Sequence, residues 1–204
     1  MIIPQLYVFA GPNGAGKSTL SASMVSPKTT VFDGDIIFQN LKKTYTDLEE
    51  SLLWANVNDV AFARWKATSL SSNADAAFET NFRSKEIMKT VELFATAGFE
   101  TRLFFMGLDS VEASIDRVKL RVAKGGHNVS VEYININYAK SLENLFSYYN
   151  SFTSVHLFQN FSPPGEQVIM TPLVNIHMGQ ITEVNSALPE WASSLYYLIK
   201  FKPL

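Results

Sequence analysis

A short glycine-rich run near the N-terminus constrains the fold of this chain more than any other feature. Eight residues match the pattern G-x-x-x-x-G-K-[ST]: Gly11, Pro12, Asn13, Gly14, Ala15, Gly16, Lys17 and Ser18. The β-rich run 5–10 precedes the pattern, and a helical pattern follows it over 17–24. Because the pattern carries meaning only between a strand and a helix, this context predicts a P-loop within an α/β fold.

The chemistry of the loop follows from its residue types. Its glycines let the backbone curl until several N–H groups point inward at phosphate oxygens, and the following helix adds the positive end of its dipole. Lys17 can then reach the β- and γ-phosphates, and Ser18 can ligate Mg²⁺. We therefore expect residues 11–19, Thr19 included, to bind ATP or GTP with Mg²⁺. The alternative is a glycine-rich turn that binds nothing.

The rest of the chain alternates between predicted strands and helices. Strands are expected at 30–32, 76–80, 99–106 and 154–158, and helices at 36–43, 48–69, 85–97, 111–123 and 131–149. This alternation implies a five-stranded, mostly parallel sheet with helices on both faces, a three-layer α/β sandwich. After residue 163, short runs predict a small antiparallel extension and a last helix: 167–171, 174–177, 180–184 and 188–201.

Length and composition fit one domain. The 204 residues are 47% apolar and 18% charged, which supplies enough material for a packed core. We expect a single domain over 1–204, with its core over 1–160 and a C-terminal extension over 161–204.

Charge and residue types exclude several classes of protein. Seventeen Lys and Arg against nineteen Asp and Glu leave a net charge of -2, without the basic surplus that a nucleic-acid partner demands. The chain has no cysteine, which excludes disulfides, a thiolate nucleophile and cysteine-held metals. No apolar stretch approaches the ~20 residues that cross a bilayer. We expect a cytoplasmic protein with neither a nucleic-acid nor a membrane partner.

Acidic residues follow two of the predicted strands. Asp33 and Asp35 come after the strand 30–32, and Glu79 lies near the end of the strand 76–80. In open α/β sheets ligands bind outside the carboxyl ends of the strands, so these acids are expected near the P-loop. The strand 99–106 ends without an acid, so Mg²⁺ would be shared among Ser18, phosphate oxygens, water and one of these carboxylates.

The two aspartates have two interpretations. An aspartate is a favoured helix N-cap, and we expect one of the pair to cap the helix 36–43. The other, which we expect to be Asp35, can accept the proton of an attacking hydroxyl group. The alternative for Asp35 is a capping role alone.

Glu79, Thr80 and Arg83 are candidates for contact with an acceptor substrate. A carboxylate near anionic phosphates is unfavourable unless it binds the metal or the hydroxyl groups of the substrate. Alternatively, Glu79 is an ordinary surface acid with Arg83 as its partner.

Two arginines precede a Gly-Gly loop. Arg117 and Arg121 are four residues apart, so they share one helix face and can converge on a polyanion. A glycine loop that carries arginines can close over the γ-phosphate and spread its developing charge. We expect both to be lid residues; the alternative is a solvated face paired with Asp116 or Glu112.

Together these segments resemble the zeta-toxin family of P-loop kinases and its predicted-ATPase relatives. The resemblance is carried by GPNGAGKST at 11–19, FDGD ending at Asp35, FETNFR at 78–83 and the run 97–129, and it continues weakly through 137–145. It implies a P-loop kinase fold. For the toxin branch it also implies ATP-dependent phosphorylation of a UDP-N-acetyl amino sugar at its 3′-hydroxyl, which blocks cell-wall synthesis, and an antitoxin protein as partner.

The resemblance also assigns roles by position. It implies that ATP and Mg²⁺ are held by Lys17 and Ser18, and that Asp35 is the base that activates the hydroxyl group. Substrate contacts would come from Glu79 and Arg83, and Arg121 would clamp the phosphates as a lid arginine.

Two departures from the family pattern bear on these roles. Family members often carry an arginine-rich IRRRY-like stretch after the lid, where this chain has Ile-Asn-Ile-Asn-Tyr at 134–138. A second phosphate contact would then come from Lys140, Lys124 or Arg117. The usual Asn-Ala-Asp is replaced by Asp33-Gly34-Asp35, which adds Asp33 as a metal contact.

We therefore expect an ATP-dependent kinase that transfers the γ-phosphate to a hydroxyl group of a small molecule, with a UDP-N-acetyl amino sugar as the acceptor implied by the resemblance. Two alternatives stay open. One is a nucleotide-binding switch or catalytically weakened P-loop protein, and the other is a kinase of another metabolite or of a polynucleotide end.

Overall fold

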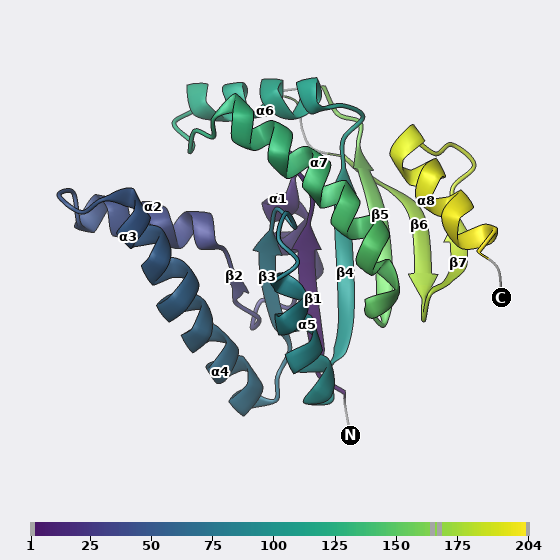
Figure 1. Ribbon diagram of the computed structural model, residues 1–204, viewed down its shortest axis with the longest axis horizontal. Helices are drawn as coiled ribbons and strands as arrows, with labels where there is room; N and C mark the ends of the chain where they lie inside the picture. Colours follow the sequence, from purple (N-terminus) through teal and green to yellow (C-terminus); the bar gives the residue numbers. More distant parts are fainter. Residues whose placement is uncertain (1–2, 164–165, 167–168, 203–204) are drawn as a thin grey trace.

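A seven-stranded sheet forms the centre of the computed structural model, which describes residues 3–163, 166 and 169–202 (Figure 1). In spatial order the strands are β2 (Val31–Phe32), β3 (Ala76–Thr80), β1 (Gln5–Ala10), β4 (Glu100–Gly107), β5 (Ser154–Asn160), β6 (Met170–His177) and β7 (Gln180–Val184). The first five pair in parallel, and β6 and β7 join by antiparallel pairing. The predicted α/β fold, a five-stranded parallel sheet with antiparallel strands after it, is confirmed.

Helices connect the parallel strands as crossovers, and a last helix follows β7. They are α1 (Lys17–Met24), α2 (Gly34–Thr44), α3 (Glu50–Ala55), α4 (Phe62–Ser72), α5 (Ile87–Thr96), α6 (Val111–Ala123), α7 (Val131–Tyr148) and α8 (Glu190–Lys200). A π-helical turn, Asn56–Ala61, joins α3 to α4, and a 3₁₀ turn, Tyr149–Ser151, follows α7. No helix in the described ranges combines the length and apolar character that a membrane crossing requires.

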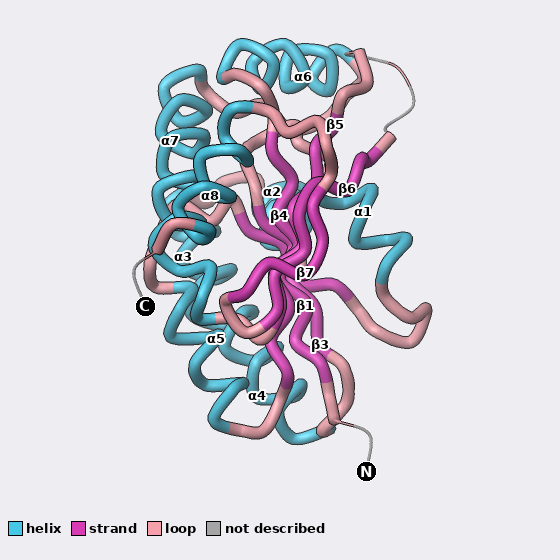
Figure 2. Tube along the Cα trace, turned by 90° about the vertical axis from the view of Figure 1, so that its right-hand side faces the viewer, coloured by secondary structure: helices cyan, strands magenta, loops and turns pink. Residues whose placement is uncertain are grey.

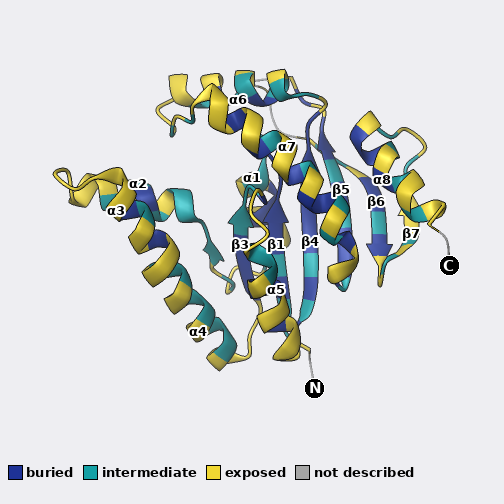
Figure 3. Ribbon diagram, in the orientation of Figure 1, coloured by how far each residue is buried: buried dark blue, intermediate teal, exposed yellow. Residues whose placement is uncertain are grey.

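The two faces of the sheet are covered unequally. Figure 2 shows α1 on one side of the sheet, while α4, α5, α7 and α8 lie on the other. Successive side chains of β1 point to opposite faces of the sheet and so help to form a core on each face. Leu6 and Val8 point into the larger core, and Phe9 points toward α1. The central strands are buried on both faces (Figure 3), as their nearly continuous apolar sequences require.

Two predicted elements differ in the structure. The helix expected over 48–69 extends from Glu50 to Ser72 and contains the π-helical turn; it ends where Asn73 adopts a left-handed conformation, φ 49°. The runs 167–171 and 174–177 are not two strands of a separate meander. The described part belongs to one strand, β6, while Gln167 and Val168 lie outside the described residues.

β6 extends the main sheet because it pairs with the free edge of β5, from Ser154 opposite His177 to Asn160 opposite Met170. Pro172, whose nitrogen cannot donate a ladder hydrogen bond, lies opposite Phe158 beside the register shift of this pair. The sequence pattern broke at this proline, whereas the strand continues through it.

Candidate functional site

The P-loop, residues 11–18, connects β1 to α1 at the carboxyl end of the parallel strands. Gly11, Gly14 and Gly16 have positive φ angles of 140°, 76° and 98°. A Cβ on Gly11 would lie 2.1 Å from the carbonyl oxygen of Met106, so this position has no room for a side chain. No side chain caps the N-terminus of α1, which leaves its first N–H groups to an anion.

Lys17 folds back over the loop. Its Nζ donates to the carbonyl oxygens of Gly11 at 3.0 Å and Pro12 at 3.1 Å, and to Oδ1 of Asn81 at 2.9 Å. Burial lowers the pKa of Lys17 most strongly. Three neighbouring carboxylates oppose that shift and raise the pKa: Glu79, Asp35 and Asp33. The ammonium group therefore lies where acids and the P-loop meet.

Asn81 is a site residue that the sequence analysis missed. It follows β3 directly, within the FETNFR segment, and its position after a strand beside β1 was the available signal. Its contact with Lys17 spans 64 residues of sequence. A ligand phosphate that attracts Lys17 must compete with this hydrogen bond.

Glu79 accepts hydrogen bonds from two serines of α1, Ser18 and Ser21. Its Oε2 accepts from Ser18 Oγ at 2.8 Å and its Oε1 from Ser21 Oγ at 2.7 Å. Burial raises the pKa of Glu79, while the two hydroxyl donors lower it. The carboxylate thus lies beside the P-loop serine and is not paired with Arg83. Ser21 was also missed, although it lies one turn after Ser18 on the same helix.

The two aspartates at the start of α2 have different surroundings. Asp33 is the N-cap, and its Oδ1 accepts from the backbone N–H groups of Asp35 at 2.9 Å and Ile36 at 3.2 Å. Burial raises the pKa of Asp33, and the nearby charge of Asp35 raises it further. The Asp35 carboxylate is half-buried and makes no hydrogen bond within the described residues, and its charge raises the pKa of both Lys17 and Asp33.

The two arginines of α6 also have different surroundings. Arg121 Nη2 donates to the carbonyl oxygen of His127 at 2.9 Å, and its charge lowers the pKa of Lys17. Arg117 instead turns toward the end of β5 and the residues that follow it. Its Nη2 donates to the carbonyl and side-chain oxygens of Asn160, both at 3.3 Å, and to the carbonyl oxygen of Ser162. Burial lowers the pKa of Arg117.

The turn after β3 is held by its own side chains. Thr80 Oγ1 accepts from the backbone N–H of Phe82 at 3.0 Å, and Phe82 has a positive φ of 52°. Asn144 of α7 donates to the carbonyl oxygen of Phe82 at 2.8 Å. Arg83 then projects over the ring of Tyr133, with its guanidinium 5.6 Å from the ring centroid. Thr80 therefore shapes the turn that directs Arg83 toward α7.

The segment that replaces the arginine-rich stretch binds the P-loop. Asn137 donates to Oδ1 of Asn13 at 2.7 Å, and Ser114 of α6 donates to the Asn13 carbonyl oxygen at 2.6 Å. Lys140 forms an exposed ion pair with Glu143 at 2.6 Å. α7 thus reaches the P-loop through an amide rather than a guanidinium group.

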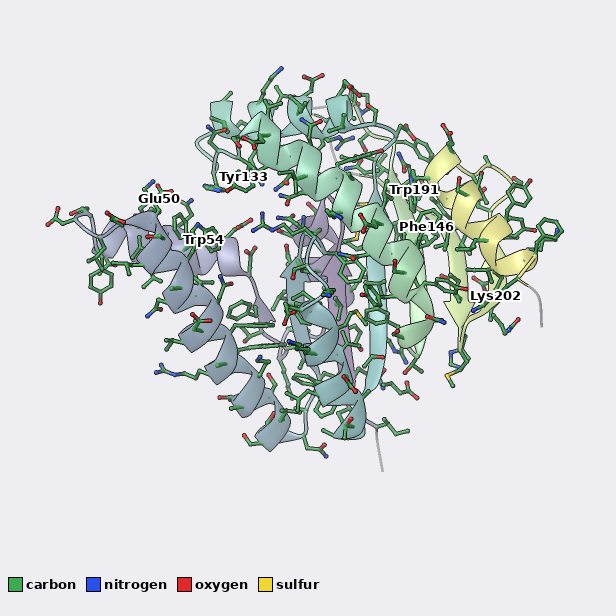
Figure 4. All side chains as sticks on the ribbon, in the orientation of Figure 1. Glu50, Trp54, Tyr133, Phe146, Trp191 and Lys202 are labelled. Carbon is green, nitrogen blue, oxygen red and sulfur yellow. The ribbon has the colours of Figure 1, made fainter. Side chains whose placement is uncertain are left out.

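The helices α2, α3 and α4, which we call the arm, follow β2 and include Asp35. Phe38 of α2 stacks on Trp54 of α3 with ring centroids 4.3 Å apart, and both pack with Leu53 and Val57. Figure 4 shows Trp54 on the arm and Tyr133 on α7, which lies above and to the right of the arm in this view. The arm brings Asp35 to the P-loop because α2 begins directly after β2.

Comparisons with known proteins place this site in a family. The model of the AAA_33 family, described as an AAA domain, matches residues 6–142. An uncharacterized protein of Haemophilus influenzae is 23% identical over 130 residues, which cover 64% of this chain and 89% of that protein.

Several solved structures share the fold. The complex AvrRxo1-ORF1:AvrRxo1-ORF2, crystallised with sulphate ions, matches 99% of this chain with a TM-score of 0.65 and 14% identity. This chain spans 65% of the length of that one. The same complex has also been crystallised with ATP, and matches with a TM-score of 0.62.

Two further structures match with lower coverage. A structure from the PezAT chromosomal toxin–antitoxin system of Streptococcus pneumoniae covers 77% of this chain and is itself covered to 69%, with a TM-score of 0.59 and 16% identity. A protein of Chloroflexus aurantiacus described as a candidate kinase covers 69% of this chain and is covered to 78%, with a TM-score of 0.55 and 17% identity.

These likenesses confirm the resemblance at the level of the fold alone, which this chain shares with the three solved structures. The AAA_33 match extends over more than half of the chain and includes the whole P-loop. The chain therefore belongs to the AAA_33 family of AAA domains.

Proposed function

We propose that this protein is a kinase that transfers the γ-phosphoryl group of ATP to a hydroxyl group of a small molecule. The observation that carries the proposal is the position of Asp35. Its carboxylate makes no hydrogen bond within the described residues, and it acts on the pKa of Lys17, the residue that reaches the β- and γ-phosphates. A base and a phosphate-binding lysine in one site are the parts that phosphoryl transfer to a hydroxyl requires.

The nucleotide would bind at the P-loop. Its backbone curls through three left-handed glycines, and the N-terminus of α1 has no side-chain cap. Support also comes from a structural neighbour of the same fold that has been crystallised with ATP. Lys17 would leave Asn81 to bind the β- and γ-phosphates, a short movement of one side chain.

The donors at this site fit Mg²⁺, which prefers oxygen ligands and binds through one or two carboxylates together with substrate phosphates. Ser18 and Asp33 would hold the ion, and Glu79 would fix the Ser18 hydroxyl in place. Among the described residues no three acidic or histidine side chains form a metal cluster by themselves. When bound, Mg²⁺ neutralises charge on the phosphates.

The remaining steps belong to the residues of the chain. The hydroxyl oxygen of the acceptor attacks the γ-phosphorus in line with the departing ADP, whose bond to that phosphorus breaks. Asp35 accepts the proton that the hydroxyl group loses. Arg121 and Lys17 stabilise the negative charge on the transferred group. Arg117 Nη2 already donates to two oxygens of Asn160, the last residue of β5, and to the carbonyl oxygen of Ser162. Arg117 would therefore contact phosphate only after leaving these acceptors.

For the acceptor we propose a UDP-N-acetyl amino sugar, on the basis of the sequence resemblance. Arg83 lies over Tyr133 and can reach an anionic or hydroxyl-rich ligand between β3 and α7. Glu79 would have two roles: it would hold the Ser18 hydroxyl group in place, and it would contact the acceptor substrate. An antitoxin partner is part of the same proposal, since one neighbour comes from a toxin–antitoxin system. Because the proposed reaction consumes ATP, we propose that the protein acts in the cytoplasm.

The second candidate function is a nucleotide-dependent switch, and Asn137 favours it. Asn137 occupies the segment in which the family carries arginines, and it ties α7 to the P-loop. In a switch, ATP binding at the P-loop would change the position of α7 through this contact. Such a protein would need no acceptor substrate.

One experiment separates the two candidates. Purified protein is incubated with Mg-ATP and a panel of hydroxyl acceptors, including nucleotide sugars, and ADP is measured. ADP formation that depends on one acceptor supports the kinase, and Asp35→Asn should then abolish transfer while ATP binding is retained. ATP binding without turnover on any acceptor supports the switch. If Asp35→Asn keeps full activity, Asp35 is not the base.

A further inference from the structure

The loop between α6 and α7, residues 124–130, packs against Arg121. A Cβ on Gly126 would lie 2.5 Å from Arg121 Cγ, so the loop can approach the arginine this closely only as glycine. The loop then turns back until the carbonyl oxygen of His127 accepts from Arg121 Nη2 at 2.9 Å. We call residues 124–130 the lid loop. Its conformation and that of the Arg121 side chain are therefore set together.

The ring of His127 binds the arm. Its Nδ1 lies 2.7 Å from Nε2 of Gln39 on α2, and its ring meets that of Phe38 edge-on, with centroids 6.2 Å apart. Since an amide nitrogen only donates, Nδ1 is the acceptor and the ring proton is on Nε2. Phe38 is itself stacked on Trp54, so the ring meets a packed surface of the arm.

Gln39 and Asp35 share one face of α2. They are four residues apart, which is about one helical turn, so their side chains lie one above the other. The lid loop thus reaches the arm one turn after the carboxylate proposed as the base. A continuous series of contacts runs from Arg121 through His127 to Gln39, and through one turn of α2 to Asp35.

We propose that the contact between His127 and Gln39 is a latch that fixes Arg121 relative to Asp35. His127 and Gln39 are positioning residues, because they act through Arg121 and the proposed function assigns them no contact with phosphate or acceptor. The effect of the latch on catalysis rests on the proposed function, whereas its effect on the position of the lid loop does not. A single neutral hydrogen bond changes an equilibrium by about 2- to 10-fold, so the latch can release without unfolding the domain.

The first experiment measures the position of the lid loop without using activity. The chain has no cysteine, so Lys43→Cys on the arm and Lys124→Cys in the lid loop give two unique sites for spin labels. Both positions are exposed. Double electron–electron resonance on the ligand-free protein should give one narrow distance distribution. His127→Ala or Gln39→Ala should broaden it, whereas the neighbouring exposed Asn128→Ala should not.

The second experiment measures catalysis with the acceptor found by the panel. His127→Ala should lower kcat about tenfold with a smaller change in the KM for ATP, because Arg121 loses its position and the P-loop does not. His127→Gln, whose amide can still pair with Gln39, should recover most of the activity. The double variant His127→Ala/Gln39→Ala should be no slower than the slower single variant, because both remove the same contact.

The outcomes separate this inference from the proposed function. If the distance distribution is as narrow in both alanine variants as in the wild type, the latch is wrong, whatever the kinetics show. If the distribution broadens but no acceptor is phosphorylated, the latch stands and the kinase proposal fails. If the kinase is active and the two single losses multiply in the double variant, the two residues act independently and the latch is refuted.

Discussion

Glu79 provides a prediction in which stability and function change in opposite directions. The substitution Glu79→Gln removes the charge and keeps the shape of the side chain. Both hydrogen bonds can be retained, because Ser18 and Ser21 hydroxyl groups accept as well as donate. The variant therefore isolates the cost of a buried carboxylate beside Asp33.

The direction of the stability change follows from the pKa. Burial raises the pKa of Glu79 above its ordinary value of 4.5, so the folded state favours the neutral form. This contribution to stability is fully present below the ordinary pKa and is lost as the pH rises through the raised value. Glu79→Gln keeps the neutral state at every pH, and we therefore expect it to stabilise the ligand-free protein at pH 8.

The assay is thermal unfolding followed by circular dichroism. For a chain of this length each ~1 kcal/mol of added stability raises Tm by roughly 2–4 °C, so a change of this order is measurable. We expect the rise at pH 8 and expect it to vanish at pH 4. Glu92→Gln on α5, an exposed position, is the matched control and should leave Tm unchanged at both pH values.

Mg-ATP should reverse the ranking. A ligand that binds only the folded protein stabilises it, and tighter binding stabilises it more. We expect the wild type to bind Mg-ATP more tightly than Glu79→Gln, so its Tm should rise more. The reasoning is refuted if Glu79→Gln lowers Tm at pH 8 without ligand, because the carboxylate would then be stabilised by its donors and by Lys17 more than burial penalises it.

Three further substitutions test the packing around the site. Gly11→Ala would place a Cβ 2.1 Å from the Met106 carbonyl oxygen at a φ of 140°, so we expect a loss of stability of ~2 kcal/mol or more in chemical unfolding and loss of ATP binding. Gly107→Ala would drive a Cβ to 2.2 Å from the buried ring of Trp191, and should lower the free energy of unfolding by ~1–3 kcal/mol. Asn137→Ala breaks the hydrogen bond that ties α7 to the P-loop and should cost ~1–3 kcal/mol in urea titrations, with weaker ATP binding in calorimetry. An Asn137→Ala variant as stable as the wild type would contradict the last of these.

Much of the fold could be predicted from local sequence. The P-loop pattern fixes a strand, a turn with left-handed glycines and a helix, and all three are observed. Alternating strands and helices require crossovers, which gave the parallel part of the sheet. The attachment of β6 to β5 could not be read locally, because Pro172 interrupts the apolar pattern of β6 and the pairing depends on a distant strand.

The candidate site was predicted less completely because its contacts join distant segments. The i,i+4 spacing placed Arg117 and Arg121 on one helix face, but it could not show that Arg117 binds Asn160 at the end of β5, 43 residues away. Sequence indicated an acid at the end of β3, but not that Ser18 and Ser21 would both donate to it. The contact between Gln39 and His127 spans 88 residues and has no local signal.

The central claim is that the P-loop and Lys17 bind the phosphates of a nucleotide. Isothermal titration calorimetry of Mg-ATP into the wild-type protein tests it most directly. We predict saturable binding with one site per chain, weakened at least tenfold in Lys17→Ala. Absence of binding for both Mg-ATP and Mg-GTP to the folded wild-type protein would contradict the account.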